Sequence, residues 1–416
     1  MQATPPLLPL ALFALTYLGL GVGHVPPFRL DRTGFALLGA VAFLATGAIT
    51  VAEAKEAVDA PTLALLFGMM ILSAQYRVSG LYGAIGRRLA RIADERHLLA
   101  GIILAGAGLS ALLTNDVVCF ALAPLIGGAL LAAGRDPLPH LIALACATNL
   151  GSALTPIGNP QNILIAQRLA LPFVPFLLAC ALPVAASLAV LYGLVARRLP
   201  RLGRAAADRP GSPLLPGVPA PLDEAFDRRQ AIKGVALTLA AIGLFLSPVP
   251  MPLTALAIAG IVLATRRTTT RDMLALVDWQ LLALFVGLFV VVRGFELSGW
   301  TDWMGARAIQ AGADLTHPAF LVPVVAVLSN LVGNVPAVML LLPFVGRGAS
   351  VGHALALAST FAGNAILIGS IANLIVAEQA ERLGIRFGFR EHARIGLPVT
   401  LAALAFAILF LLVGLA

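Results

Sequence analysis

Long apolar runs set the fold class of this chain. Runs long enough to cross about 30 Å of hydrocarbon occupy residues 5–23, 34–52, 60–76, 173–196, 234–247, 252–265, 279–293 and 395–415. Only 12% of the residues are charged, against roughly 25% in soluble domains. Because lipid cannot hydrogen-bond a backbone, segments that cross it are helices or closed barrels, and runs of this length favour helices. The sequence therefore predicts an all-α polytopic membrane protein.

Polar residues interrupt four further apolar segments. The interruptions are Thr114-Asn115-Asp116, Gly158 to Asn162, Gly333-Asn334 and Gly369 to Asn373. Non-helical backbone at membrane depth is tolerated only inside protein or beside a water-filled cavity. A carboxylate such as that of Asp116 costs about 3 kcal/mol or more near the bilayer centre. We therefore predict that the interruptions line a functional site.

The second half of the chain repeats the first. Four motifs recur 219 residues later: Val58-Asp59 as Val277-Asp278, Ser79-Gly80 as Ser298-Gly299, Asn115 as Asn334, and Pro124 as Pro343. Gly158 and Asn162 recur 211 residues later, as Gly369 and Asn373. The constant spacing predicts an N-terminal repeat over 1–197, a linker over 198–233 and a C-terminal repeat over 234–416.

The distribution of basic residues predicts the topology. If each repeat has five transmembrane helices plus a re-entrant hairpin, the odd number inverts the second repeat and places the broken helices at the midplane. This arrangement puts 23 of the 28 Lys and Arg residues on one side, which the positive-inside rule assigns to the cytoplasm. We expect a bacterial cytoplasmic (inner) membrane protein with both termini periplasmic and the linker cytoplasmic.

The chemistry of broken helices selects the candidate site residues. Half-helix N-termini hold anions, whereas freed carbonyls and Asn or Asp oxygens hold cations. The expected substrate- or ion-binding residues are the polar members of the four tips: Thr114, Asn115, Asp116, Asn159, Gln161, Asn162, Gly333, Asn334, Ser370 and Asn373. Gly158, Pro160 and Gly369 are expected to allow the backbone turns.

Charge at the tips is asymmetric. Asp116 has no acidic counterpart, because Val335 occupies its repeat position. We therefore predict that Asp116 couples transport to H⁺ or Na⁺. No Lys or Arg stands near the four tips in the sequence, so an anion is expected to be held by helix N-termini and amides.

Enzyme motifs do not fit this chain. The only lysines are Lys55 and Lys233, so no phosphate loop ending in Lys-Ser or Lys-Thr exists. Gly348 to Gly352 matches Gly-x-Ser-x-Gly, but that motif needs a strand–turn–helix context and here lies between apolar helices. The three cysteines lack metal-site spacing. We expect no enzyme activity, no metal and no cofactor beyond a coupling Na⁺ or H⁺.

Three motifs resemble those of the ion transporter superfamily, which includes arsenite efflux permeases, citrate and dicarboxylate/sodium symporters, and one class of sodium/proton antiporters. They are Thr114-Asn115-Asp116 with Pro124, the run from Asn149 to Asn162, and the run from Gly363 to Asn373. The Ser-Asn-Thr signature of the dicarboxylate group is absent at both tips. The pattern is most similar to a little-characterised anion-permease branch near the arsenite permeases. The resemblance implies a scaffold domain, a moving transport domain and, in many members, a dimer.

Taken together, the paired broken helices and the resemblance favour a secondary active transporter. The expected substrate is a small inorganic or organic anion or oxyacid, moved by elevator-like alternating access with H⁺ or Na⁺ coupling. The alternatives are an Na⁺/H⁺ antiporter, an arsenite efflux permease and, outside transporters, an ion channel. Expected partners are the substrate, the lipid bilayer and a second copy in a homodimer. No nucleic-acid partner is expected, since the basic residues serve as loop anchors.

Overall fold

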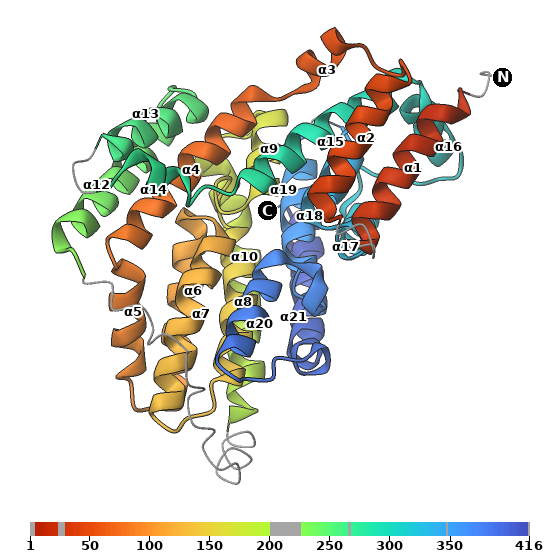
Figure 1. Ribbon diagram of the computed structural model, residues 1–416. Helices are drawn as coiled ribbons and strands as arrows, with labels where there is room; N and C mark the ends of the chain where they lie inside the picture. Colours follow the sequence, from red (N-terminus) through yellow and green to blue (C-terminus); the bar gives the residue numbers. More distant parts are fainter. Residues whose placement is uncertain (1–4, 24–29, 200–225, 265–267, 347, 415–416) are drawn as a thin grey trace.

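The computed structural model describes residues 5–23, 30–199, 226–264, 268–346 and 348–414 (Figure 1). The first half contains α1 (Leu7–Val22), α2 (Arg32–Ala45), α3 (Val51–Ala57), α4 (Ala60–Val78), α5 (Leu81–Ala90), α6 (Glu95–Leu112), α7 (Asn115–Ala132), α8 (Leu138–Ser152), α9 (Pro160–Arg168) and α10 (Phe173–Ala196). The second half contains α12 (Arg228–Phe245), α13 (Met251–Leu263), α14 (Thr270–Leu274), α15 (Trp279–Leu297), α16 (Trp300–Gln310), α17 (Pro318–Val332), α18 (Asn334–Leu341), α19 (Ala349–Ala362), the 3-10 turn η1 (Leu367–Gly369), α20 (Ile371–Arg382) and α21 (Phe389–Leu412). The described residues form no β-strand, so the predicted all-helical class is confirmed.

Several helices are long and apolar enough to cross a membrane. Five qualify singly, namely α6, α7, α10, α15 and α21, and α3 with α4 make a sixth if the pair, bent by 49°, is one span. Shorter apolar helices are α1, α2, α13, α17 and α19. The chain is therefore a polytopic membrane protein. The count of five spans plus one hairpin per repeat stays a prediction, since both α6 and α7 are long enough to cross.

The expected linker is shorter than its predicted bounds. Its central part, residues 200–225, lies outside the described residues. Helix α12 begins at Arg228, so residues 228–233 belong to a helix. Asp227 explains that start, because its side chain accepts hydrogen bonds from the backbone N–H groups of Arg229 and Gln230 and so caps the helix.

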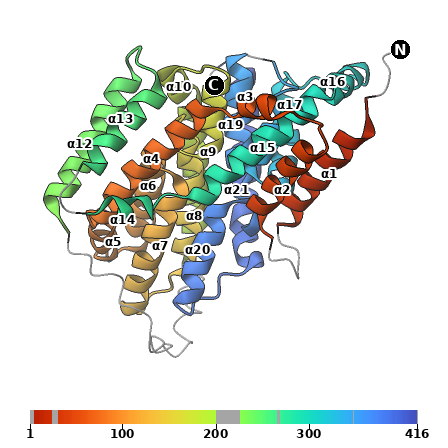
Figure 2. The ribbon, with the colours of Figure 1, turned by 45° about the horizontal axis from the view of Figure 1, so that its top comes forward.

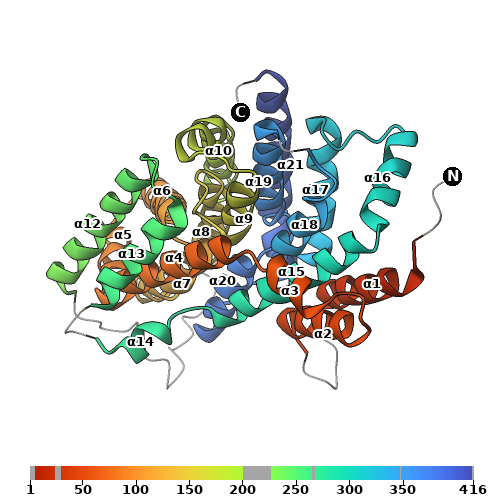
Figure 3. The same cartoon turned by 90° about the horizontal axis from the view of Figure 1, so that it is seen from above.

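A central bundle lies between two flanking groups of helices (Figures 1 and 2). Helices α6 to α10 and α17 to α21 form the bundle, where α8 packs against α6, α10 and α20. One flanking group contains α4, α12 and α13, and the other contains α1, α2 and α15, as the view from above shows (Figure 3). Each flank thus combines helices from both halves of the chain.

Two glycines permit the close packing inside these flanks. A Cβ on Gly68 of α4 would lie 2.6 Å from the carbonyl carbon of Ala255 in α13. A Cβ on Gly287 of α15 would lie 2.7 Å from that of Ala36 in α2. Both contacts exclude any larger residue at the glycine. The two contacts correspond, since each partner is shifted by 219 residues.

The motifs that recur at this spacing begin and end equivalent helices. Asp59 caps α4 by accepting from Thr62 N at 3.0 Å, and Asp278 caps α15 by accepting from Leu281 N at 2.9 Å. After each helix comes a glycine of positive φ, 67° at Gly80 and 83° at Gly299, where a side chain would be strained. The repeat is thus visible in local structure, while the inversion of the second repeat stays a prediction.

Candidate substrate-binding site

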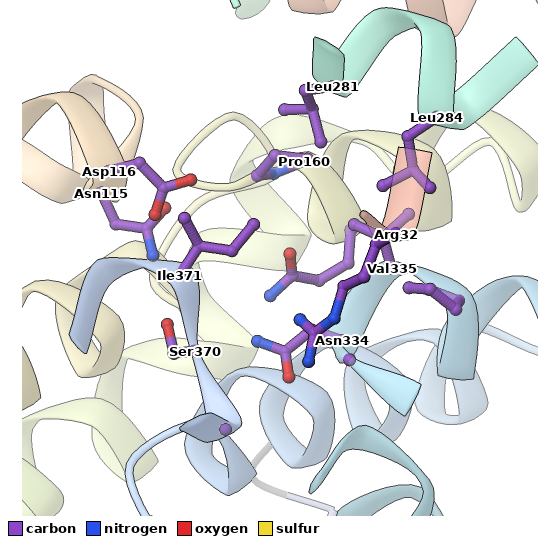
Figure 4. A pocket seen from close by; sticks show the side chains of 14 residues that line it. Arg32, Asn115, Asp116, Pro160, Leu281, Leu284, Asn334, Val335, Ser370 and Ile371 are labelled. Atoms are coloured by element: carbon purple, nitrogen blue, oxygen red, sulfur yellow. The ribbon is translucent and has the colours of Figure 1, made fainter. Parts of the chain in front are cut away.

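Four helix N-termini meet at one pocket of the central bundle (Figure 4). They are the starts of α7, α9, α18 and α20, and each contributes lining residues: Asn115 and Asp116; Pro160 and Gln161; Gly333 to Pro336; and Gly369 to Ile371. The structure therefore brings all four predicted interruptions together. It also shifts the breaks slightly, because residues 160–162 and 371–373 lie in the first turns of α9 and α20.

This convergence gives the pocket a positive potential. The first N–H groups of each helix have no partner within that helix, and the helix dipole places partial positive charge there. One such terminus already binds anions in many proteins, and here four face the same space. Gly333, which joins α17 to α18, has φ 96° and ψ 158°, a backbone conformation that favours glycine.

The first broken helix is shaped by its own asparagines. Asn162 donates from Nδ2 to the carbonyls of Ser152 at 3.2 Å and Thr155 at 3.1 Å. Asn159 caps α9 by accepting from Asn162 N at 2.8 Å. A Cβ on Gly158 would lie 2.3 Å from the Ser152 carbonyl oxygen. These three residues brace the loop and do not line the pocket.

The second broken helix repeats this bracing. Asn373 donates from Nδ2 to the carbonyls of Gly363 at 2.8 Å and Ile366 at 3.3 Å. These acceptors stand 211 residues after Ser152 and Thr155. Gly369 occupies the position of Gly158, and a Cβ there would lie 3.1 Å from the Gly363 carbonyl oxygen. The same hydrogen bonds thus hold both breaks open.

Asn149 of α8, 1% exposed, connects two of the tips. Its Oδ1 accepts from Asn115 Nδ2 at 2.9 Å and from Ser370 Oγ at 3.0 Å. Its Nδ2 donates to the Oδ1 atoms of Asn364 at 2.9 Å and Asn373 at 3.1 Å. The first hairpin tip and the second broken helix are therefore joined across the two halves. A single polar residue in an apolar run was the signal for Asn149.

Thr360 of α19 has the corresponding place on the other side. It stands 211 residues after Asn149, and its Oγ1 accepts from Asn159 Nδ2 at 3.1 Å and Gln161 Nε2 at 3.3 Å. Two amide oxygens at the pocket remain without a hydrogen-bond partner within the described residues, Oδ1 of Asn115 and Oδ1 of Asn334. They are free to accept from a ligand.

Comparison with known proteins identifies the family. The family model described as citrate transporter (CitMHS) matches residues 11–362. The chain belongs to this family. It is 30% identical to the silicon efflux transporter LSI3 of Oryza sativa subsp. japonica, covering 92% of the chain and 93% of that protein. It is 31% identical to an uncharacterised transporter of Mycobacterium tuberculosis, covering 92% and 94%.

Solved structures extend the likeness to the fold. The YdaH transporter of Alcanivorax borkumensis aligns over 98% of this chain and 96% of its own, with a TM-score of 0.58 at 17% identity. The resemblance to the ion transporter superfamily, read from the tip motifs, is thus confirmed. This CitMHS protein is a membrane transporter of the citrate-transporter and arsenite-permease type.

The expectation that no Lys or Arg lies near the tips of this CitMHS protein is wrong. Arg32, the first residue of α2, lines the pocket together with Leu281 and Leu284 of α15. Its Nη1 lies 3.3 Å from where a Cβ on Gly333 would stand. The sequence places Arg32 far from every tip. Its approach depends on the packing of α2 against α15, for which no local signal exists.

The predicted site residues of the CitMHS protein separate into two groups. Six line the pocket: Asn115, Asp116, Gln161, Gly333, Asn334 and Ser370. Four lie behind it: Thr114, Asn159, Asn162 and Asn373. Among the described residues, no cluster of three or more His, Cys, Asp or Glu side chains could hold a metal ion.

Asp116 and Arg32 do not neutralise each other. Figure 4 shows them at opposite ends of the pocket, with Ile371 between them. Neither side chain forms a hydrogen bond or an ion pair with any residue in the described ranges. Unpaired charges at membrane depth are expensive and mark functional positions. The pocket therefore presents one cationic and one anionic group to whatever enters it.

Proposed function

We propose that this CitMHS-family protein is a secondary active transporter for a small inorganic or organic anion or oxyacid. The observation that carries the proposal is the convergence of four helix N-termini on one pocket. Such termini bind anions through backbone N–H groups without a fixed counter-charge. Broken helices at paired positions are the usual substrate site of transporters built from repeats.

The hydrogen-bonding groups favour an oxyacid among the anions. An oxyacid offers oxygens to the helix N–H groups and hydroxyl protons to acceptors. The unpartnered Oδ1 atoms of Asn115 and Asn334 supply such acceptors. The relative from Oryza is named for silicon efflux, which brings inorganic cargo within the range of this family.

Asp116 is the proposed coupling residue. Its carboxylate lies in the pocket without a pairing partner in the described chain, so a proton or Na⁺ bound there would offset charge on the substrate. Its counterpart Val335 cannot bind either ion. The same carboxylate supports the second candidate, an Na⁺/H⁺ antiporter, in which the cation itself is the cargo.

The arrangement of helices supports an elevator-like mechanism. The two flanks, each built from both halves, would serve as the scaffold, and the central bundle with its tips would move. Inverted repeats give this movement two related end states. A homodimer joined through the scaffold and an inner-membrane topology with periplasmic termini complete the proposal.

Flux measurements in proteoliposomes test this function. Purified protein is offered citrate, inorganic phosphate, arsenite, arsenate and silicic acid under imposed H⁺ or Na⁺ gradients. Saturable, gradient-dependent movement of at least one of these is expected. Proton movement driven by Na⁺ alone would favour the antiporter. Ohmic current without saturation would favour a channel, and absence of all flux against empty liposomes would refute transport of these substrates.

A further inference from the structure

Arg32 is a fixed positive charge with no internal purpose in this structure. Its side chain lines the pocket beside Gly333 and has no ion-pair or hydrogen-bond partner in the described residues. A structural arginine at such depth would be paired with a carboxylate or with carbonyls. Asn115, only 5% exposed, also keeps its Oδ1 unpartnered at this pocket. Two unsatisfied groups of different type facing one space indicate a ligand.

We propose that Arg32 is a specificity residue that selects a negatively charged substrate, and that it does so from one face of the membrane only. The guanidinium presents five N–H donors in a planar fork that matches carboxylate and phosphate oxygens. The inference rests on the proposed transport function and adds to it the charge of the substrate and a difference between the two faces.

The sidedness follows from the repeat. Helix α2 begins at Arg32 and α13 begins at Met251, 219 residues later. Because α2 packs on α15 through the Ala36–Gly287 contact and α13 packs on α4 through the equivalent one, Met251 stands to α4 as Arg32 stands to α15. The apolar pocket residues Leu281 and Leu284 correspond in the same way to residues 62 and 65 of α4.

Contacts of the bundle show which flank is engaged here. Arg168 at the end of α9 forms an ion pair with Asp59, the cap of α4, at 2.9 Å between Nε and Oδ2. The equivalent pair would be Gln379 with Asp278, but Asp278 caps only α15 and Gln379 Nε2 has no partner. The bundle is thus fastened to the α4 flank, and its pocket faces the α15 flank, where Arg32 lies.

In inverted-repeat transporters, the two halves exchange environments between the two access states. The opposite state would therefore present the tips to α4 and α13, where methionine replaces arginine. The substrate would meet a charged pocket from the face where α2 begins, assigned to the cytoplasm by the distribution of basic residues. From the other face it would meet an uncharged pocket.

Sided transport assays on the full-length protein test the inference. Half-saturating concentrations are measured from each face, in right-side-out and inside-out vesicles, for phosphate, arsenate and citrate as anions and silicic acid as the neutral oxyacid. R32M should raise the half-saturating anion concentration roughly tenfold or more on the cytoplasmic face only, as for a lost charge-assisted bond. Silicic acid should be unaffected, and R32K should retain part of the anion preference.

Two further variants sharpen the test. R88M removes an exposed arginine of α5 on the same predicted face and should match wild type. M251R should lower the half-saturating anion concentration on the opposite face, which keeps the inference testable if R32M fails to fold. The inference is overturned if R32M matches R88M, or if it weakens both faces or both substrate classes equally. Absence of flux in wild type would instead refute the transport function beneath it.

Discussion

Arg168 and Asp59 join the moving part of the proposed transporter to its flank. The Nε–Oδ2 distance is 2.9 Å, and the guanidinium also lies 5.2 Å from the ring centroid of Phe289 in α15. Asp59 additionally caps α4 through its other carboxylate oxygen. One aspartate thus starts a flank helix and holds the end of broken helix α9, so any movement of α9 along the flank must break this pair.

We expect R168Q to shift the protein modestly toward the opposite access state. The arginine side chain is 44% exposed, and ion pairs in such positions contribute about 0–1 kcal/mol, so the population should change by a few-fold. Labelling of a cysteine introduced at the buried Thr62, the counterpart of Leu281, reports the opening. R293Q is a matched control, because Arg293 is also 44% exposed but pairs with Glu296 in its own helix. Equal labelling rates in the two variants would contradict the latch.

Gly158 should be intolerant of any side chain. A Cβ there would lie 2.3 Å from the Ser152 carbonyl oxygen and 2.8 Å from that of Ser110, and both atoms are backbone. G158A should therefore lower the free energy of unfolding by about 1–3 kcal/mol and reduce transport. Thermal unfolding in detergent measures the first effect. G108A is the control, since nothing lies within 4 Å of a Cβ there; a similar loss in both variants would argue against a role for the tight loop.

Glycine, proline and asparagine make the breaks and the repeat predictable. They are residues whose backbone and side-chain properties act locally, and their recurrence at fixed spacing marks Gly158 with Gly369 and Asn162 with Asn373. What could not be predicted depends on tertiary packing. Arg32 reaches the pocket only because α2 packs on α15, and no sequence pattern records that contact.

Amide side chains illustrate a second limit. Asn115 lines the pocket, while Asn162 braces a loop through two carbonyls, yet both are polar residues at an interruption of an apolar run. Either purpose requires a hydrogen-bonding group of the same size. Only the positions of the neighbouring carbonyls decide which purpose the residue serves, and these follow from the fold.

The bracing asparagines should behave as a pair. N162D and N373D preserve size but remove the Nδ2 donors to the loop carbonyls, so each should lose about 1–3 kcal/mol of stability. Because the hydrogen bonds are equivalent, the two losses should be similar. Thermal unfolding of both variants checks this. A loss of substrate affinity with unchanged stability would show instead that these residues contact the substrate.

Asp116→Asn should separate coupling from binding. Asparagine has the size of aspartate but binds no proton in this pH range and carries no charge for Na⁺. Since Asp116 lines the pocket without an internal partner in the described residues, D116N should reduce gradient-driven uptake about tenfold or more. Exchange of substrate across the membrane without a gradient should persist, because the helix N-termini and Arg32 remain. Counterflow and uptake assays on the same vesicles distinguish the two activities.

D136N makes the same chemical change outside the pocket. Asp136 accepts from Leu138 N at 3.0 Å in the turn before α8, and asparagine keeps an oxygen for that bond, so uptake should stay within about twofold of wild type. If D116N and D136N both match wild type, Asp116 is not the coupling residue. If D116N abolishes exchange as well as uptake, the carboxylate acts in substrate binding, which would place a cation in the cargo and favour the antiporter over the anion transporter.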